Sequence, residues 1–264
     1  MTDITAAMVK ELRDRTSAGM MDCKRALQET DGDFDEAVKL LRERGMAQAA
    51  KRAGRETTEG KVGVMVRDEV GAIVAVACET EPVSNNDDFL AYGEKVLRTV
   101  FEGGDPAQLE AERVELAGRL GENIQVVGAK RLQAGDGEQL HFYVHAPANK
   151  VGAVVLTRGG EPEAARSLAL HLTYARPTYR TRDEVPAELV EAEREILANS
   201  DEVRSKPENV REKIVEGQLN KKFYGESVLM EQTWYRPDES TGSVAQYLNE
   251  RGIELVDYAW YAVA

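Results

Sequence analysis

The hydrophobic residues of the first 45 positions recur at a spacing of three to four, which is typical of amphipathic helices. The polar stretches "TSAG" and "TDGD" interrupt this pattern and divide it into three short segments. Asp33 followed by Glu36 resembles a capping box at the start of the third segment, and Gly45 is suited to end it. We therefore expect a three-helix module over residues 1–45. So small a bundle leaves an apolar edge exposed, which favours a role in holding a partner.

The pattern changes after this module. Residues 46–59 are small, basic and weakly patterned, and we interpret them as a helical or flexible linker. From Gly60 onward, the apolar runs "KVGVMVRD" and "GAIVAVACET" surround a polar break, which predicts a β-hairpin. A helix over about 86–100, a second helix over about 107–120 and the strand "ENIQVVGAKRL" follow. These elements predict a first core subdomain over residues 60–134.

The same order of hairpin and helix returns in the second half of the chain. The predicted hairpin "QLHFYVHAPANKVGAVVLTRG" precedes the predicted helix "EPEAARSLALHLTYA". Acidic helical segments over about 183–222 then precede two predicted strands, "SVLMEQTWYR" and "IELVDYAWYAVA", with a short helix between them. We therefore expect an α+β protein with two core subdomains of similar plan, the second over residues 135–264 with a helical insertion.

The charge of the chain limits its partners. The 264 residues carry a formal net charge of −13, which argues against general affinity for nucleic acid, because phosphate binding needs clustered Lys and Arg. Six basic residues face one acid between Lys39 and Arg55, and we interpret this stripe as a solvated helix face. No run of about 18 apolar residues and no apolar leader occur, so we expect a cytoplasmic protein without a membrane partner.

The sequence shows no clear catalytic or metal-binding motif. The stretch "GRETTEGKV" comes close to a phosphate-binding loop, but it has Arg55 where the motif needs Gly and Val62 where it needs Ser or Thr. The three histidines accompany no nucleophile elbow. Cys23 and Cys78 have the sequence contexts of buried, reduced thiols. An enzyme that uses surface carboxylates is a weak alternative, since nothing singles out one pair.

Residues 12–27, "LRDRTSAGMMDCKRAL", predict a helix, a tight loop and a new helix that opens with two methionines, whose flexible apolar side chains suit protein contact. This stretch resembles the N-terminal signature of elongation factor Ts, the guanine-nucleotide exchange factor of bacterial elongation factor Tu. "KIVEGQLNKKF", residues 213–223, resembles a second motif of that family. The resemblance covers essentially the entire chain. It implies a three-helix module related to ubiquitin-associated domains, a linker and two α+β core subdomains.

The resemblance also implies a site at a strand tip. In elongation factor Ts this tip typically reads Cys-Glu/Gln-Thr-Asp-Phe-Val, and it enters beside the nucleotide site of the partner and helps to displace its magnesium. The corresponding residues here are Thr80, Glu81, Pro82 and Val83. Glu81 keeps the carboxylate on a longer side chain, whereas Pro82 lacks the aromatic wedge. We therefore expect weaker or differently wedged exchange, and a plain turn that ends the strand is the alternative.

Four further residues resemble family positions that contact the partner. Arg13, Met20 and Met21 correspond to a surface for a helix of the GTPase domain, and His171 corresponds to a contact with another domain of the partner. The alternative for the methionines is packing within the small bundle, which we expect for one of them because adjacent helical residues point about 100° apart. A satisfied core histidine is an equal alternative for His171.

The resemblance therefore implies an exchange factor that acts on elongation factor Tu through protein contact, with no cofactor, no metal and no direct nucleotide binding. The alternative is a diverged protein that holds the GTPase, as a chaperone would, with weak or no exchange, and Pro82 favours it. The acidic segment 183–203 has helical periodicity without a sustained heptad, so it allows a homodimer without requiring one.

Overall fold

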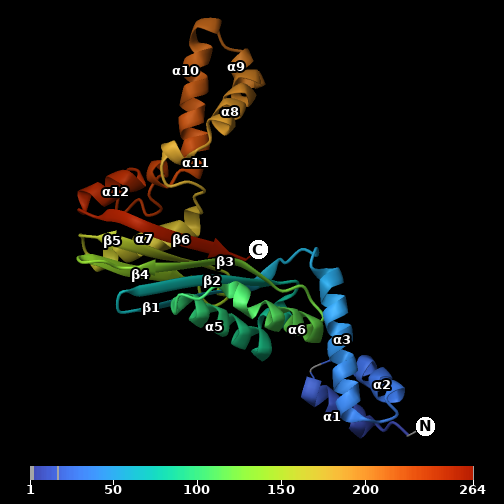
Figure 1. Ribbon diagram of the computed structural model, residues 1–264. Coiled ribbons are helices and arrows are strands. Elements are labelled where there is room, and N and C mark those ends of the chain that lie inside the picture. The colour runs from blue at the N-terminus through green and yellow to red at the C-terminus, as the bar shows by residue number, and fades with distance from the viewer. Residues whose placement is uncertain (1–2, 17, 264) are drawn as a thin grey trace. The chain divides into compact units, whose positions relative to one another are not determined.

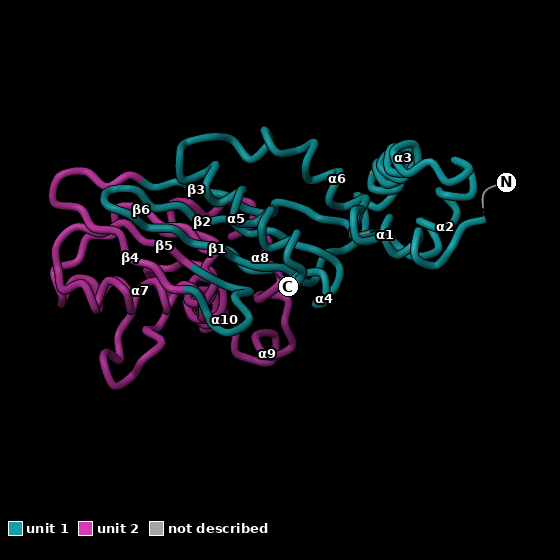
Figure 2. Tube along the Cα trace, turned by 90° about the horizontal axis from the view of Figure 1, so that it is seen from below, with its two compact units in different colours: residues 1–132, 144–152, 261–264 teal, residues 133–143, 153–260 magenta. Residues whose placement is uncertain are grey.

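The computed structural model describes residues 3–16 and 18–263, and the chain forms two compact units (Figure 2). The first unit comprises residues 1–132, 144–152 and 261–264, and the second comprises residues 133–143 and 153–260. The chain combines helices with two three-stranded sheets, each of which contains a β-hairpin, and this confirms the expected α+β class. The predicted subdomain boundaries stay a prediction.

Three helices open the first unit: α1 (Ala6–Thr16), α2 (Met20–Glu29) and α3 (Phe34–Arg52). Their shared core consists of small and aliphatic side chains at the predicted spacing: Val9, Leu12, Cys23, Ala26, Leu27 and Ala37. The Asp33 carboxylate caps α3 by accepting hydrogen bonds from the backbone N–H groups of Asp35 and Glu36, at 2.9 and 3.0 Å. The predicted three-helix module is confirmed.

Helix α3 does not end at Gly45, so that expectation is wrong. The residues that follow Gly45 are good helix formers, mainly Ala, Gln, Lys and Arg, and the helix continues through Arg52. Gly45 instead allows a close approach to α6 (Glu110–Leu120), because a Cβ atom on Gly118 would lie 2.6 Å from the Gly45 carbonyl carbon. The first half of the predicted linker is therefore helical.

A three-stranded sheet with the order β1-β2-β3 forms the body of the first unit. Strands β1 (Glu59–Arg67) and β2 (Val70–Cys78) form the predicted antiparallel hairpin, and β3 is Gln125–Gln133. The central strand β2 is buried at nearly every position, which explains its continuous apolar sequence. Helices α5 (Asp87–Phe101) and α6 pack their apolar residues with those of β2 in one core. A 3₁₀ turn, Pro106–Leu109, joins these two helices.

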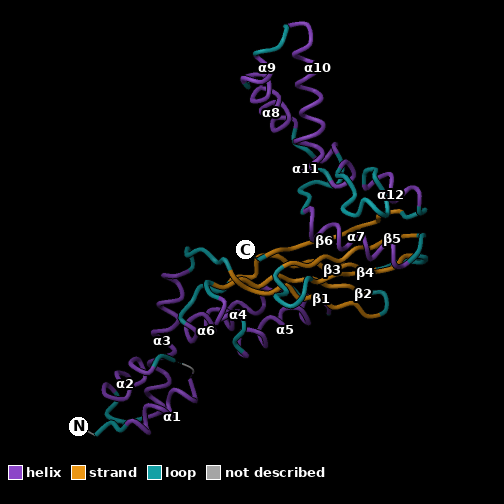
Figure 3. The backbone as a smooth tube through the Cα atoms, turned by 180° about the vertical axis from the view of Figure 1, so that it is seen from behind, coloured by secondary structure: helices purple, strands orange, loops and turns teal. Residues whose placement is uncertain are grey.

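A second three-stranded sheet has the order β4-β5-β6. Its strands and the two helices that share its core are, in chain order, β4 (Glu138–Val144), β5 (Val151–Arg158), α7 (Pro162–Ala175), α12 (Val244–Glu250) and β6 (Glu254–Ala262). The central strand β5 is again the buried, continuously apolar one. Hairpin followed by helix is thus the order in both sheets, as the sequence predicts (Figure 3).

The acidic insertion folds as a helical hairpin within the second unit. Helices α8 (Ala187–Asn199) and α10 (Glu208–Gln218) lie side by side, and the short helix α9 (Asp201–Arg204) joins them (Figures 1 and 3). A six-residue π-helical turn, Leu219–Tyr224, continues α10, and α11 (Gly225–Ser227) follows it. Leu197, Val203, Val215 and Leu219 form the core of the hairpin.

The predicted strand "SVLMEQTWYR" is wrong. This segment forms a 3₁₀ turn, Leu229–Glu231, and two isolated bridges, Tyr179 to Val228 and Thr233 to Ser243. Its apolar residues face the core from an irregular backbone, whose N–H groups bond partly within local turns and partly to the distant carbonyl groups of Tyr179, Arg180 and Gly242. In the described part of the chain, no helix combines the length and apolar character that a membrane span requires.

Candidate functional site

The predicted tip forms a short helical turn directly after β2. Helix α4 (Glu81–Ser84) begins one residue after Thr80, and Pro82 lies in its first turn, where the fixed φ of proline is favourable. Glu81 and Pro82 are exposed, whereas Val83 is half-buried and packs against the core of the first unit. The tip therefore exposes the Glu81 carboxylate and the Pro82 ring to solvent, and Val83 attaches it to the core.

The Glu122 carboxylate holds the base of the tip. Its Oε2 atom accepts hydrogen bonds from the backbone N–H groups of Glu79 and Thr80, at 3.1 and 3.0 Å. Its Oε1 atom accepts a hydrogen bond from the Thr80 hydroxyl at 2.5 Å. The Thr80 hydroxyl thus does not cap α4, although Thr80 occupies the N-cap position. The Thr80 hydroxyl is therefore bonded within the protein, whereas Glu81 and Pro82 are exposed to solvent.

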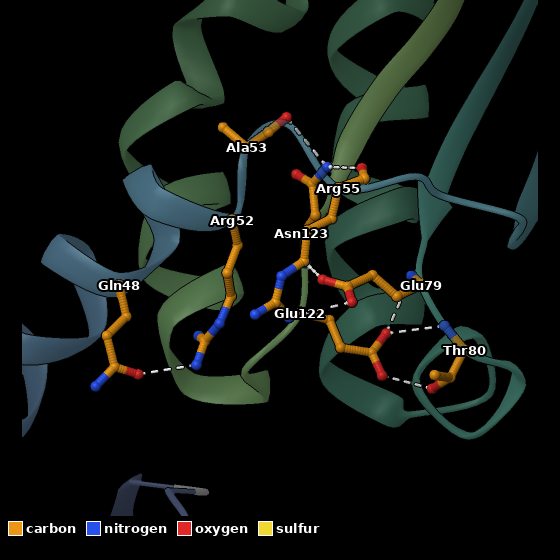
Figure 4. A network of polar contacts seen from close by, with 8 residues as sticks. All are labelled: Gln48, Arg52, Ala53, Arg55, Glu79, Thr80, Glu122 and Asn123. Atoms are coloured by element: carbon orange, nitrogen blue, oxygen red, sulfur yellow. Dashed lines mark hydrogen bonds and ion pairs between the residues drawn. The ribbon is translucent and has the colours of Figure 1, made fainter.

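A second set of contacts joins the same region to the end of α3 (Figure 4). The Glu79 carboxylate accepts a hydrogen bond from the Asn123 backbone N–H at 2.6 Å, and it pairs with Arg55 at 3.3 Å. The Asn123 side-chain amide, which is buried, donates to the carbonyl oxygens of Arg55 and Ala53, at 2.7 and 3.3 Å. The tip, the turn after α6 and the segment after α3 therefore share one polar network.

Both cysteines are buried thiols, as the sequence predicts. Burial raises the pKa of Cys78 to about 12, and the negative charge of Glu122 acts in the same direction. The Cys78 thiol donates to the Thr80 carbonyl oxygen at 3.3 Å, so it supports the tip. Burial also raises the pKa of Cys23. Both groups are therefore neutral at physiological pH, and neither has the character of a nucleophile.

Met20 and Met21 open α2, and both side chains are largely exposed, at 56% and 64%. The expectation that one of them packs within the bundle is wrong, because the core contacts of α2 begin only at Cys23. Arg13, on α1, is exposed as well. Two adjacent, exposed, flexible apolar side chains at a helix start suit contact with another protein.

His171 is completely buried, which favours the core-histidine alternative. Its Nε2 atom forms a hydrogen bond with Gln232 Oε1 at 3.0 Å, and its ring stacks on that of Trp234 with centroids 5.1 Å apart. Burial lowers its pKa to about 4. The His171 side chain therefore packs in the core of the second unit, and its contact with a partner stays a prediction.

Several exposed apolar side chains are candidates for partner contact that the sequence reasoning missed. Tyr174 follows His171 by three positions on α7 and is 74% exposed. Its signal in the sequence is an aromatic residue outside the phase of the buried residues Leu168 and Leu172. Leu189 and Ile196 are seven positions apart on α8, so they share one face of that helix, and both are exposed.

The described residues contain no group of three or more His, Cys, Asp or Glu side chains placed to hold a metal ion.

The low pKa of His171 predicts a loss of stability in acid. The unfolded chain binds the proton with an ordinary pKa near 6.5, whereas the folded protein binds it only near 4, so the unfolded state holds more protons between these values. The contribution of neutral His171 is complete above about pH 6.5 and falls by about 3 kcal/mol as the pH falls to 4. Urea unfolding at pH 7 and pH 4 measures this loss.

The control for this prediction is a variant that lacks the buried imidazole. His171→Leu should lose about 3 kcal/mol less than the native protein over this pH range, because it has no proton to bind there. Equal pH dependence of the native protein and the His171→Leu variant would contradict the prediction.

Comparison with known proteins shows extensive similarity to one family. A family model described as Elongation factor TS matches residues 79–264. An elongation factor Ts of Symbiobacterium thermophilum is 40% identical over 259 residues, which cover 91% of this chain and 84% of the relative. The elongation factor Ts of Thioalkalivibrio sulfidiphilus is 39% identical over 270 residues, covering 97% of this chain and 91% of the relative. That of Idiomarina loihiensis is 37% identical over 272 residues, covering 98% and 91%.

Proposed function

This chain belongs to the elongation factor Ts family, and we propose on that basis that it promotes GDP release from elongation factor Tu during translation elongation. It acts by protein contact and favours the nucleotide-free state of the GTPase. Its place of action is the cytoplasm, where translation occurs. The observation that supports this role in the structure is the exposed Glu81 and Pro82 pair on a firmly bonded strand tip.

Exchange of this kind follows from thermodynamic coupling. If the protein binds nucleotide-free elongation factor Tu more tightly than the GDP form, it lowers the affinity of that GTPase for GDP by the same factor. A coupling of 1–3 kcal/mol, which is common for linked sites, changes affinity by about 5- to 150-fold. The exchange factor therefore needs complementary surfaces and no catalytic chemistry of its own.

Two surfaces of the first unit have separate roles in nucleotide exchange. The exposed methionines Met20 and Met21 supply apolar contact with the GTPase, which holds the complex together. The tip residues enter beside its nucleotide site, where the Glu81 carboxylate competes electrostatically for the environment of the magnesium ion. Pro82 gives the tip stiffness at little entropic cost, and Val83 anchors it in the core.

The test is stopped-flow release of fluorescent GDP from elongation factor Tu of the same organism. With magnesium present, the native protein should accelerate release by about 100-fold or more, and Glu81→Gln should lower the maximal rate by about tenfold. With magnesium chelated, the two proteins should release GDP at similar rates, because the carboxylate then has no metal to act on.

Glu102→Gln serves as the matched control, because Glu102 is an exposed glutamate of the same unit at the end of α5. It should leave the rate unchanged. If the native protein binds the GTPase without accelerating release, the protein holds its partner without exchange, and the proposed function is wrong. A Pro82→Phe variant measures in the same assay how much an aromatic wedge adds.

A further inference from the structure

We propose that Glu122 is a positioning residue, which fixes the tip Thr80–Val83 in the orientation that nucleotide exchange requires. This inference rests on the proposed function, because it assigns a role within the same site. It starts from one observation: a single carboxylate accepts three hydrogen bonds from the two residues that precede α4.

Both donors follow the end of β2 at Cys78. The paired register of β1 and β2 ends with Glu59 opposite Cys78, so the N–H groups of Glu79 and Thr80 lie beyond the ladder. Glu122 replaces the missing strand partner at this point. Without its carboxylate, these N–H groups would bond to water, and the chain would be free to change direction between β2 and α4.

The turn after α6 is what brings Glu122 to the tip. Helix α6 ends at Leu120, and Gly121 adopts a left-handed conformation with φ of 77°. A residue with a side chain rarely adopts this conformation, so glycine is required for the sharp reversal. The next residue, Glu122, then lies beside Glu79 and Thr80, which are more than 40 positions away in the sequence.

The contact is reciprocal, which makes it rigid. Glu122 binds the backbone of the tip segment, and Glu79 of the tip segment binds the backbone N–H of Asn123. The Asn123 amide in turn binds the carbonyl oxygens of Arg55 and Ala53 after α3 (Figure 4). A movement of the tip would break the bonds to Glu122 and to Glu79 at once, and both of these acceptors are carboxylates, which form the stronger kind of hydrogen bond.

Rigidity at this position has a consequence for exchange. A tip that is ordered before binding does not lose conformational freedom when it enters the GTPase, so more of the contact energy is available to displace GDP. Loosening the tip should therefore reduce the maximal rate of GDP release. It should leave the apparent affinity almost unchanged, because Met20 and Met21 lie on the separate α2 surface.

The variant Glu122→Gln tests this role at constant side-chain size. The glutamine amide has one neutral acceptor oxygen in place of a charged carboxylate, so the bonds from the Glu79 and Thr80 N–H groups lose their charge-assisted strength, and the NH₂ group can only donate to the Thr80 hydroxyl oxygen. We expect the maximal rate of GDP release to fall about tenfold or more, with the half-saturating concentration changed by less than about threefold. The control Glu112→Gln alters an exposed glutamate of α6 whose ion pair is with Lys95, and it should behave as the native protein.

Amide hydrogen exchange gives a second measurement that does not depend on the GTPase. The N–H groups of Glu79 and Thr80 should exchange at least about tenfold faster in Glu122→Gln, while amides in the middle of β2 keep their native protection. Thr80→Val removes only the hydroxyl contact, and it replaces Glu122→Gln if that variant does not fold. It should show a smaller increase in exchange at the same two amides and a smaller loss of maximal rate.

The outcomes separate this inference from the proposed function. If the native protein does not accelerate GDP release, the proposed function fails and the role of Glu122 fails with it. If the native protein is active and Glu122→Gln has the same maximal rate, the positioning role alone is overturned. A rise in half-saturating concentration at an unchanged maximal rate would also overturn it, since Glu122 would then act in binding.

Discussion

Replacing Met20 and Met21 together by aspartate is expected to raise the concentration needed for half-maximal GDP release from elongation factor Tu by at least about 100-fold. Both side chains are exposed in the free protein, so the substitution should leave the bundle folded. In the complex, however, two carboxylates would have to leave water without a partner, which costs several kcal/mol. A titration of stopped-flow GDP release measures the change, and the maximal rate at saturation should be retained.

Met46→Asp is the matched control, because Met46 is another exposed methionine, 43% accessible, in helix α3 outside the predicted contact surface. It should keep the native half-saturating concentration. A Met20→Leu, Met21→Leu variant keeps the apolar character and should lose little affinity. An unchanged half-saturating concentration in the double aspartate variant would exclude this surface from the interface.

Trp234→Ala is expected to lower the free energy of unfolding by about 3–5 kcal/mol. Trp234 is 2% exposed and lies between two rings: it stacks on Tyr247 with centroids 3.5 Å apart and on His171 with centroids 5.1 Å apart. Its indole N–H donates to Glu239 at 3.2 Å. Truncation would remove the central ring of this stack and leave a cavity in the core of the second unit. Urea unfolding followed by circular dichroism measures the loss.

The control for the tryptophan is Tyr174→Ala, which truncates an exposed aromatic residue of the same unit. It should change the free energy of unfolding by less than about 1 kcal/mol, because most of its surface is already in water. A loss below about 1 kcal/mol for Trp234→Ala would show that the core collapses around the gap and that the stack contributes little.

Local sequence signals predicted those elements whose formation depends on neighbours in the chain. The central strands β2 and β5 are buried along nearly their whole length, and their continuous apolar runs are distinct. Asp33 and Asn86 cap helices where the sequence shows a short polar side chain before an amphipathic segment. These features need only the chain within a few residues of each position.

The sequence-based expectations were wrong where contacts between distant parts of the chain determine the local structure. Gly45 has the sequence of a helix end, yet it serves the close crossing of α3 with Gly118 of α6. The apolar residues around Trp234 suggest a strand, yet they fill a core from an irregular segment. In both cases a residue preference that is ambiguous locally is settled by packing against an element more than 10 positions away.

The candidate site also contains residues that the sequence indicated and one residue that it did not. Its outward residues, Glu81 and Pro82, could be found from the sequence because they form part of a short contiguous motif. The sequence also predicted the methionines as contact residues, but their exposure depends on where the core of the three-helix bundle ends. The sequence did not indicate that Glu122 belongs to the site. The residues "EN" before an apolar run have the pattern of a strand start, whereas β3 begins only at Gln125.

The sequence by itself thus determined the α+β class, the order of hairpins and helices, and the family to which the chain is similar, because periodicity and contiguous motifs are properties of neighbouring residues. Only the tertiary structure decided that His171 is buried, that both methionines are exposed, and that Glu122 binds Glu79 and Thr80. The physical reason is that burial and hydrogen bonding depend on chain segments that are distant in sequence and meet only in the folded protein.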